Sequence, residues 1–456
     1  MLSFLTIVSL LMGNLTGSVN IFKTEENYST SPIKIYENGW LEEQYGIKIV
    51  HLKGSFYDMG YQYGSLLKYE ILKGLRAQKT LLPIFGVTYT EIQEDFWNNQ
   101  KNYMSEETLD YIQGTADALG INIDDYGWVW LLEGVAYFKL PSPTFDYCSS
   151  FAAWGNATSS GELIQVRMID GPPKCKDPVT GEPFESNPIL VVADPDDGNA
   201  FAYPTFAGYC AEDGFNEMGI SVMSMWSRNN GYKTVHGAPI GTRILETLYT
   251  ASDIETALSI MTTNKTYGYM MIISDSKIPL SYAVETTGNL TYFGTWDNTI
   301  ESTYPFWEID HVVRRINCLY INETFAATQR ENYNPKSIRY IISNFPGLRK
   351  ILGVPEDFGV YSRYCRYQST SIGIQQNWGK IDLKNAMEIA KKMYLGGYFL
   401  PWKLLCIKLK SFETWWIWAV SGKTGDLLIS YMTPENPAYK NPSYQFNLFE
   451  LLESQP

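Results

Sequence analysis

The chain has 456 residues, of which 45% are hydrophobic and 19% are charged, and its formal net charge is −13. A globular chain of this length buries a large core, as one large domain or as two ordinary ones. The acidic balance argues against a nucleic-acid partner, which requires clustered Lys and Arg side chains.

An apolar run that ends in small residues opens the chain, so residues 1–17 resemble a secretory signal peptide. No later stretch reaches about 18 uninterrupted apolar residues, and we therefore expect no transmembrane span. Asn-x-Ser/Thr tripeptides, which are candidate N-glycosylation sites, occur at Asn27, Asn156, Asn264, Asn289 and Asn322. The leader and the tripeptides together predict a secreted or lysosomal glycoprotein.

Residues 18–147 have a mostly helical pattern. A predicted strand at 46–52 is followed by a glycine-spaced segment, 54–64, which begins a helix that extends to about residue 82. Further helices are predicted at 90–103, 105–119 and 124–138. Residues 141–146 then form a proline-containing linker that we expect to be exposed and accessible to cleavage.

Residues 148–170 have the pattern of a β-hairpin, with two β-prone runs that flank a loop rich in Gly, Ser and Asn. Cys148 opens the first run, and Arg167 and Asp170 close the second. Because a hairpin folds its two ends together, the three side chains can meet in space, and a nearby cation favours a thiolate. The residues alone leave the alternative open that Cys148 is a buried structural cysteine and that Arg167 and Asp170 form a surface ion pair.

Beyond the hairpin, strand-like and helical patterns alternate, which indicates an α+β protein. A helix is predicted at 252–263, with Ser252 as its N-cap and Glu255 three residues on, and another around Asp310 and His311. Further helices are predicted at 240–250, 337–345 and 383–393. Strands are predicted at 189–193, 200–206, 219–225, 267–274, 280–285, 290–294, 415–420 and 427–431.

The cysteines occur at positions 148, 175, 210, 318, 365 and 406 and include no Cys-x-x-Cys pair. With only His51, His236 and His311 available, we predict neither a metal site nor a cofactor. If Cys148 is a nucleophile, the other five cysteines allow two disulfides and one free thiol, and the pairing stays open.

The sequence Cys-Ser-Ser-Phe-Ala-Ala-Trp-Gly from Cys148, followed by Arg167-x-x-Asp170, resembles the start of the catalytic chain in N-terminal-nucleophile (Ntn) hydrolases. The most similar branch is that of the self-processing proteins like penicillin acyl-coenzyme A:isopenicillin N acyltransferase, which are related to choloylglycine hydrolases and acid ceramidase. The segment 54–64 and the turn at 214–219 are also similar to this family. The resemblance implies a four-layer αββα sandwich. It also implies autocatalytic cleavage between Tyr147 and Cys148, with 18–147 and 148–456 remaining one structural domain.

In this family the free α-amine of the cysteine is the base, and its ordinary pKa of about 7.7–8.0 suits that task. By resemblance, Asp170 would hold the amine, and Arg167 would favour the thiolate or orient the substrate carbonyl. The stretch 354–366 resembles the choloylglycine-hydrolase segment with a catalytic arginine, which makes Arg363 a candidate. Relatives often supply an oxyanion-hole Asn where this chain has Tyr269, so the Tyr269 hydroxyl or a backbone N–H would donate instead.

The predicted function is that of a self-processed cysteine Ntn amidohydrolase or acyltransferase acting on a linear, non-peptide amide. N-acylethanolamines, ceramides, N-acyl amino acids and conjugated bile acids are all compatible substrates, and the cleaved N-terminal chain would be a partner. Two alternatives remain open because a fold does not decide a function. One is a phospholipase-B-like acyl-ester hydrolase, and the other is a non-catalytic secreted glycoprotein on the same fold.

Overall fold

The computed structural model describes residues 34–139, 148–171, 175–226, 232–302, 307–317, 358–399 and 413–456. It contains two β-sheets together with helices, which confirms the predicted α+β class. The predicted leader, the linker at 141–146, Tyr147, the helix at 337–345, Asn27 and Asn322 all lie outside the described residues.

The larger sheet has ten strands and includes residues from both sides of the predicted cleavage site. Its neighbours are antiparallel except β3 and β6, which run parallel with Lys48 opposite Ile189 and Gly54 opposite Pro195. The strand order is β1 (Lys34–Tyr36), β2 (Gly39–Gln44), β3 (Ile47–Gly54), β6 (Pro188–Pro195), β7 (Phe201–Phe206), β8 (Asp213–Asn216), β9 (Ile220–Trp226), β10 (Tyr269–Asp275), β11 (Leu280–Thr286) and β12 (Thr291–Gly294).

The smaller sheet has six strands and is antiparallel throughout. The predicted hairpin forms its β4–β5 pair, in which Ser149 lies opposite Met168 and Ala153 opposite Ile164. The strand order is β13 (Val312–Ile316), β4 (Ser149–Ala153), β5 (Ile164–Asp170), β14 (Thr414–Ser421), β15 (Asp426–Tyr431) and β16 (Tyr444–Asn447).

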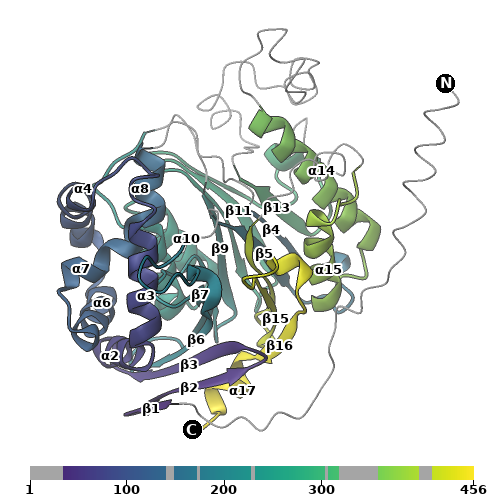
Figure 1. Cartoon of the computed structure of the whole chain (residues 1–456). Helices are drawn as coiled ribbons and strands as arrows, with labels where there is room; N and C mark the ends of the chain where they lie inside the picture. The colour runs from purple at the N-terminus through teal and green to yellow at the C-terminus, as the bar shows by residue number, and fades with distance from the viewer. Residues whose placement is uncertain are drawn as a thin grey trace, which may run out of the picture.

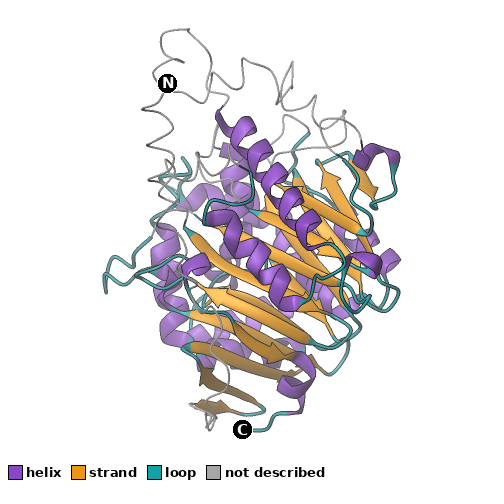
Figure 2. Ribbon diagram, turned by 90° about the vertical axis from the view of Figure 1, so that its right-hand side faces the viewer, coloured by secondary structure: helices purple, strands orange, loops and turns teal. Residues whose placement is uncertain are grey.

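Helices cover the outer faces of the two sheets (Figure 1). On the ten-stranded side, α2 contacts β3, α9 contacts β8 and β9, and α10 contacts β10, whereas α14 and α15 pack on the six-stranded sheet and cross its strands in Figure 2. The helices are α2 (Phe56–Leu66), α3 (Lys68–Lys79), α4 (Tyr89–Glu91), α5 (Asn98–Gln100), α6 (Glu106–Leu119), α7 (Ile123–Gly127), α8 (Leu132–Lys139), α9 (Ile240–Thr250), α10 (Ile254–Thr262), α14 (Phe358–Asn377), α15 (Leu383–Tyr394) and α17 (Leu448–Glu453).

The glycine-spaced segment 54–64 allows helices α2 and α6 to pack closely. A Cβ at Gly60 of α2 would lie 2.1 Å from the backbone oxygen of Tyr111 in α6, and a Cβ at Gly114 of α6 would lie 2.1 Å from the backbone oxygen of Tyr57. Real Cβ atoms do not approach oxygen this closely, so the two helices can cross here because both positions lack a side chain. The glycine pattern therefore serves the packing of the N-terminal segment.

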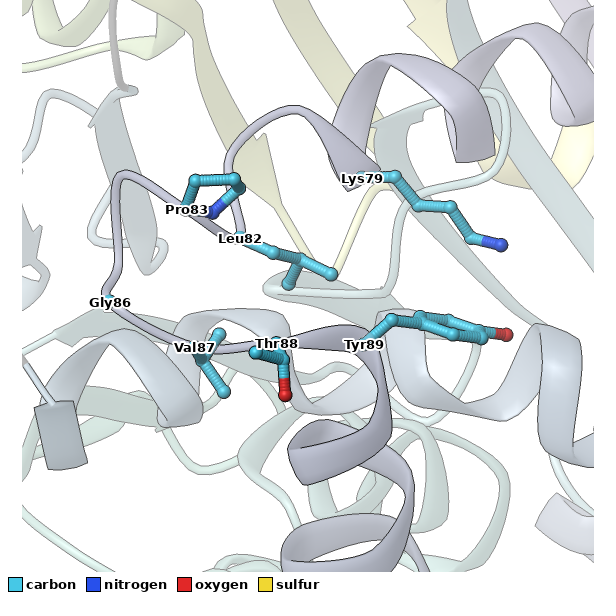
Figure 3. A pocket seen from close by; sticks show the side chains of 7 residues that line it. All are labelled: Lys79, Leu82, Pro83, Gly86, Val87, Thr88 and Tyr89. Carbon is cyan, nitrogen blue, oxygen red and sulfur yellow. The ribbon is translucent and has the colours of Figure 1, made fainter.

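A pocket of about 450 Å³ opens between the end of α3 and the start of α4 (Figure 3). Lys79 lies over the Tyr89 ring, with Nζ 3.9 Å from the ring centroid. Thr88 and Glu91 form a capping box that fixes the start of α4. None of the predicted site residues lines this pocket.

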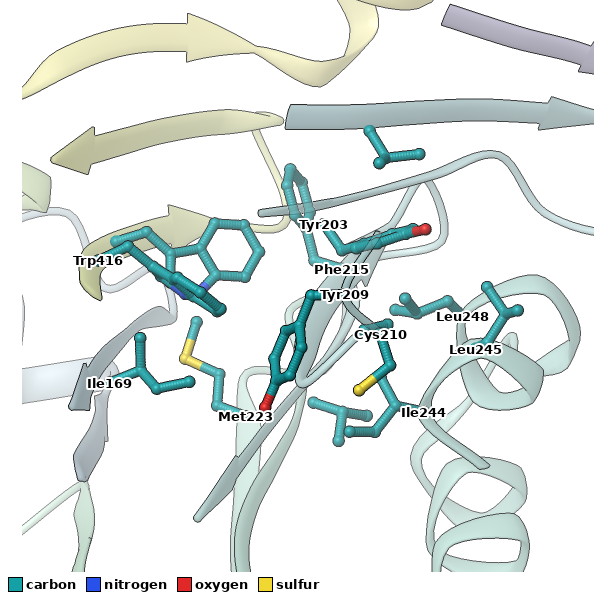
Figure 4. Packing of buried hydrophobic residues seen from close by; sticks show 14 of the residues in the cluster. Ile169, Tyr203, Tyr209, Cys210, Phe215, Met223, Ile244, Leu245, Leu248 and Trp416 are labelled. Carbon is teal, nitrogen blue, oxygen red and sulfur yellow. The ribbon is translucent and has the colours of Figure 1, made fainter. Parts of the chain in front are cut away.

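The two sheets face each other across a tightly packed interior. Ser150 Oγ of β4 lies 3.8 Å from Met223 Sδ of β9. Figure 4 shows Ile169 and Trp416 from the smaller sheet packed beside Met223, with the side chains of α9 on the other side of the larger sheet. The side chains of β4, β5 and β14 are buried along their whole length because these central strands are covered on both faces.

Two local predictions were wrong, and two strands were not predicted. Residues around His311 form a turn that leads into β13, not a helix, because the two arginines of this strand find buried partners on opposite faces: Ser371 for Arg314 and Glu301 for Arg315. The N-cap of α10 is Asp253 instead of Ser252, since Asp253 Oδ1 accepts from Thr256 N at 2.8 Å. The region before β3 contains the unpredicted strands β1 and β2, which extend the sheet edge.

Candidate functional site

Cys148 immediately precedes β4, and its side chain is 7% exposed. Its sulfur lies 3.9 Å from the backbone oxygen of Asp170 at the end of β5. The Cys148 carbonyl accepts two hydrogen bonds, from the Asn317 backbone N–H at 3.2 Å and from Arg366 Nη2 at 2.9 Å. The backbone of the cysteine is therefore held by two segments distant from it in the sequence.

Arg167 lies between the sheets and is fully buried. Its Nε donates to Asp213 Oδ1 at 2.9 Å, its Nη1 donates to Met168 O at 2.9 Å, and its Nη2 lies 3.8 Å from Glu212 Oε2. Asp213 Oδ2 also accepts from Trp416 Nε1 at 3.1 Å. The carboxylate of Asp213 in β8 and that of Glu212 just before it thus compensate the guanidinium, which satisfies the requirement for burying a charge.

Asp170 points toward the helices that cover the smaller sheet. The Tyr394 hydroxyl of α15 donates to Asp170 Oδ2 at 2.7 Å, and Arg366 Nη1 of α14 lies 3.8 Å from the same oxygen. The other oxygen, Oδ1, is buried and has no hydrogen-bond partner among the described residues. Burial raises the pKa of Asp170 to about 6, although Arg366 opposes this. The Thr414 hydroxyl also lowers this pKa, and it has no hydrogen-bond partner of its own among the described residues. Beside Thr414, Oδ1 can accept from a further donor.

Burial also sets the pKa of the Cys148 thiol. It raises the pKa of Cys148 to about 11; Arg167 lowers this pKa, and the carboxylates of Asp170 and Glu212 raise it further. Burial likewise raises the pKa of Glu212, to about 7. In the intact chain, in which the nitrogen of Cys148 belongs to a peptide bond, the thiol thus stays protonated at neutral pH.

The structure brings Cys148, Arg167 and Asp170 together, as the hairpin pattern predicts. Arg363 lies in α14, but its side chain is outside the described residues. Arg366, three residues along the same helix, reaches both the Cys148 carbonyl and Asp170. Arg366 belongs to the same stretch, 354–366, that singled out Arg363 in the sequence.

The structure does not bring Tyr269 to the side of Cys148. Met223 of β9 faces β4, and Met223 pairs with Ile272 of β10, whereas Tyr269 pairs with Trp226. Because successive side chains of a strand alternate between faces, Tyr269, three residues before Ile272, projects toward the helices on the outer face. The oxyanion donor expected here therefore has no support from the position of Tyr269.

Sequence reasoning missed Glu212, Asp213, Arg366, Tyr394 and Asn317. A signal existed for the first two, because adjacent acidic residues within an apolar stretch are rare unless they are paired. Sequence gave no comparable signal for Tyr394 or Asn317, which lie on α15 and directly after β13. Their place in the site follows from how α15 and β13 pack around the hairpin.

Several other predicted features can be located. Asn156, Asn264 and Asn289 are exposed. The thiols of Cys148 and Cys175 are free and buried. Within the described residues, no cluster of three or more His, Cys, Asp or Glu side chains could hold a metal ion. No helix in the same part of the chain is both long and apolar enough to cross a membrane.

Comparisons with known proteins give partial matches. No family model matches the chain. Protein dcd1B of Dictyostelium discoideum is 26% identical over 236 residues, which cover 46% of this chain and 44% of that protein, so the match spans less than half of either.

Solved structures with partial similarity include a mutant conjugated bile acid hydrolase from Clostridium perfringens (TM-score 0.37, 15% identity, covering 66% of this chain and 93% of that chain). They also include penicillin V acylase from Agrobacterium tumefaciens (TM-score 0.37, 12% identity, covering 66% and 87%). At these scores neither alignment assigns a family.

Proposed function

We propose that the chain is a self-processing cysteine Ntn hydrolase, on a four-layer αββα sandwich, that cleaves a linear, non-peptide amide of an N-acylated substrate. The observation that carries the proposal is the geometry around Cys148. A buried thiol at the start of a strand lies beside a compensated guanidinium, and the Asp170 carboxylate has one unfilled acceptor position. A free α-amine on Cys148 would supply the donor that Asp170 Oδ1 lacks.

Self-processing would start from the thiol of Cys148. The sulfur attacks the Tyr147 carbonyl carbon, the C–N bond breaks as the C–S bond forms, and the thiol proton passes to the departing amine. Water then opens the thioester, which leaves a carboxylate on Tyr147 and restores the thiol. The pairing of β3 with β6 supports continued association of the two chains, because the strands lie on opposite sides of the cut.

Substrate turnover would follow the same chemistry. The α-amine takes the thiol proton, the thiolate attacks the amide carbonyl, and the protonated amine returns the proton to the leaving amine. Water, or an acceptor amine in an acyl transfer, then releases the acyl group from Cys148. The high pKa of the thiol in the intact chain fits this order, since the base becomes available after cleavage. A secreted or lysosomal location remains part of the proposal.

Burial of the thiol favours one alternative, a non-catalytic glycoprotein in which Cys148 is inert. Intact mass and N-terminal sequencing separate the two. Wild type should give two fragments, the second starting at Cys148, and C148A should give one chain. C175A, which removes another buried thiol, should be processed as wild type is. Cleavage that persists in C148A would overturn the self-processing claim.

The reaction class is tested on the processed protein. An N-acyl amide and the ester with the same acyl chain are offered as substrates, and we expect faster turnover of the amide, with C148A inactive on both. Preference for the ester would favour the phospholipase-B-like alternative. No turnover of either compound by processed protein would favour the binding role.

A further inference from the structure

Arg243 of α9 carries a buried guanidinium that the proposed hydrolase site does not use. Its side chain is 1% exposed. Nη1 donates to the backbone oxygen of Met261 in the last turn of α10. Nε and Nη2 are buried and have no hydrogen-bond partner in the described part of the chain. One edge of the guanidinium is therefore fixed, and the other is unfilled.

The unfilled edge, formed by Nε and Nη2, is the edge through which arginine binds a carboxylate in a bidentate manner. Arg76 shows the filled arrangement in the same protein: its Nε and Nη2 donate to Asp177 Oδ1 and Oδ2, each at 2.7 Å. The planar fork of arginine matches the two oxygens of a carboxylate or two oxygens of a phosphate. Arg243 presents the same pair of donors in a more buried setting without the acceptor.

Arg243 has no ion-pair partner among the described residues. No carboxylate of the described residues lies within ion-pair distance of the guanidinium. Tyr267 and Tyr269, and to a smaller extent Glu246, raise the pKa of Arg243 against the effect of burial.

Lys265 adds a second, half-buried cation: its Nζ donates to Thr262 O at 2.9 Å, one residue from the Met261 oxygen that Arg243 binds. Burial and Arg243 both lower the pKa of Lys265. Burial likewise lowers the pKa of Arg243 to about 10. In a chain with a net charge of −13, a buried guanidinium that has a half-buried cation beside it and no ion-pair partner is unexpected, because an uncompensated buried charge is costly.

We propose that Arg243 and Lys265 form a binding site for an oxyanion, the carboxylate or phosphate group of a small ligand. Nε and Nη2 of Arg243 would bind two of its oxygens, and Lys265 would add charge at the half-buried side. The hydrogen bond to Met261 explains how the guanidinium is oriented but leaves two donors unexplained. This site lies on the outer face of the ten-stranded sheet, and its existence does not depend on the proposed hydrolase function.

The test measures thermal unfolding and equilibrium binding with three probes at constant ionic strength. These are inorganic phosphate, N-acetylglycine as a carboxylate, and N-acetylglycinamide as its neutral match. At about ten times the dissociation constant, either anion should raise the Tm of the wild type by about 2 °C, and the amide should not. Phosphate alone would identify a free oxyanion site, and N-acetylglycine alone would identify a site for an acylated carboxylate.

Three variants make the test specific. R243M should lose the anion-induced shift, and without anion it should unfold at the same or a higher temperature than wild type. R243K keeps the charge but lacks the fork, and should bind at least about tenfold more weakly. R76Q is the control: it removes a guanidinium whose two donors are already bound to Asp177, so it should respond to anions as wild type does. The proposal is overturned if neither anion binds wild type, or if both Arg243 variants keep the wild-type affinity.

Discussion

Substitutions of opposite charge around Cys148 should move its reactivity in opposite directions. In the intact chain the pKa of the thiol is about 11, chiefly because of burial, with Arg167 lowering this pKa and Asp170 raising it. D170N should therefore lower the thiol pKa, and R167M should raise it. The D170N effect should diminish below pH 6, because Asp170, with a pKa of about 6, is then protonated in the wild type as well.

The expected sizes follow from the charges and the burial. At pH 8 a thiol of pKa about 11 is roughly 0.1% ionised, against roughly 10% at the ordinary value of 9.0, so alkylation should be about a hundredfold slower than for free cysteine. A unit charge about 5 Å away in an effective dielectric of about 20 contributes about 3 kcal/mol, or about two pKa units. We therefore expect D170N to accelerate alkylation ten- to a hundredfold, and R167M to slow it by a similar factor.

The assay uses iodoacetamide, a timed quench and mass spectrometry of tryptic peptides. The peptide of residues 140–167 spans the predicted cut, so its alkylated form reports intact chains alone. In R167M the corresponding peptide ends at Lys174. Cys175, whose buried thiol has a pKa of about 12, is the internal reference, and it is followed in a parallel Glu-C digest as the peptide that begins at residue 163, because trypsin would release it as a dipeptide. The electrostatic reasoning fails if both variants shift the rate in the same direction, or if wild-type Cys148 in intact chains reacts as fast as free cysteine.

Three further predictions concern stability, measured by urea unfolding in a C148A background that keeps the chain intact. G114A should destabilise by about 3 kcal/mol or more, because its Cβ would lie 2.1 Å from a backbone oxygen of α2, whereas G120A, at a positive φ with open space, should cost about 1 kcal/mol. The folded pKa of Glu212 is raised from 4.5 to about 7, so the stability it contributes is full below pH 4.5 and is lost as pH rises through 7. The difference in free energy of unfolding between the E212Q variant and its parent should therefore grow by about 3 kcal/mol in favour of E212Q as the pH rises from 4.5 to 8. A difference that does not change with pH would refute this. The folded pKa of Lys391 is lowered by burial from 10.5 to about 7, so K391M should be more stable than wild type by up to about 5 kcal/mol at pH 6, with the gain disappearing by about pH 10.5.

Features that depend on neighbouring residues were predictable. The β-prone runs and the Gly-, Ser- and Asn-rich loop predict the hairpin, and the structure forms it as β4 and β5. The roles of Cys148, Arg167 and Asp170 in catalysis stay predictions, but their proximity follows from the hairpin alone. The errors are also local: Asp253, one residue after the predicted cap, accepts the N-terminal hydrogen bond of α10, because caps compete within one or two residues.

Periodicity and turn residues act over a few positions, so they were enough to predict the α+β class and the position of the cysteine at the opening of a hairpin. The groups that surround that cysteine come from segments distant in the sequence, and local patterns could not predict them. Arg366 donates to the Cys148 carbonyl from 218 residues away, and Asp213 binds Arg167 from the opposite sheet. The alternation of β10 turns Tyr269 to the outer face. Such contacts depend on how two sheets and their covering helices pack, and no local pattern records that packing.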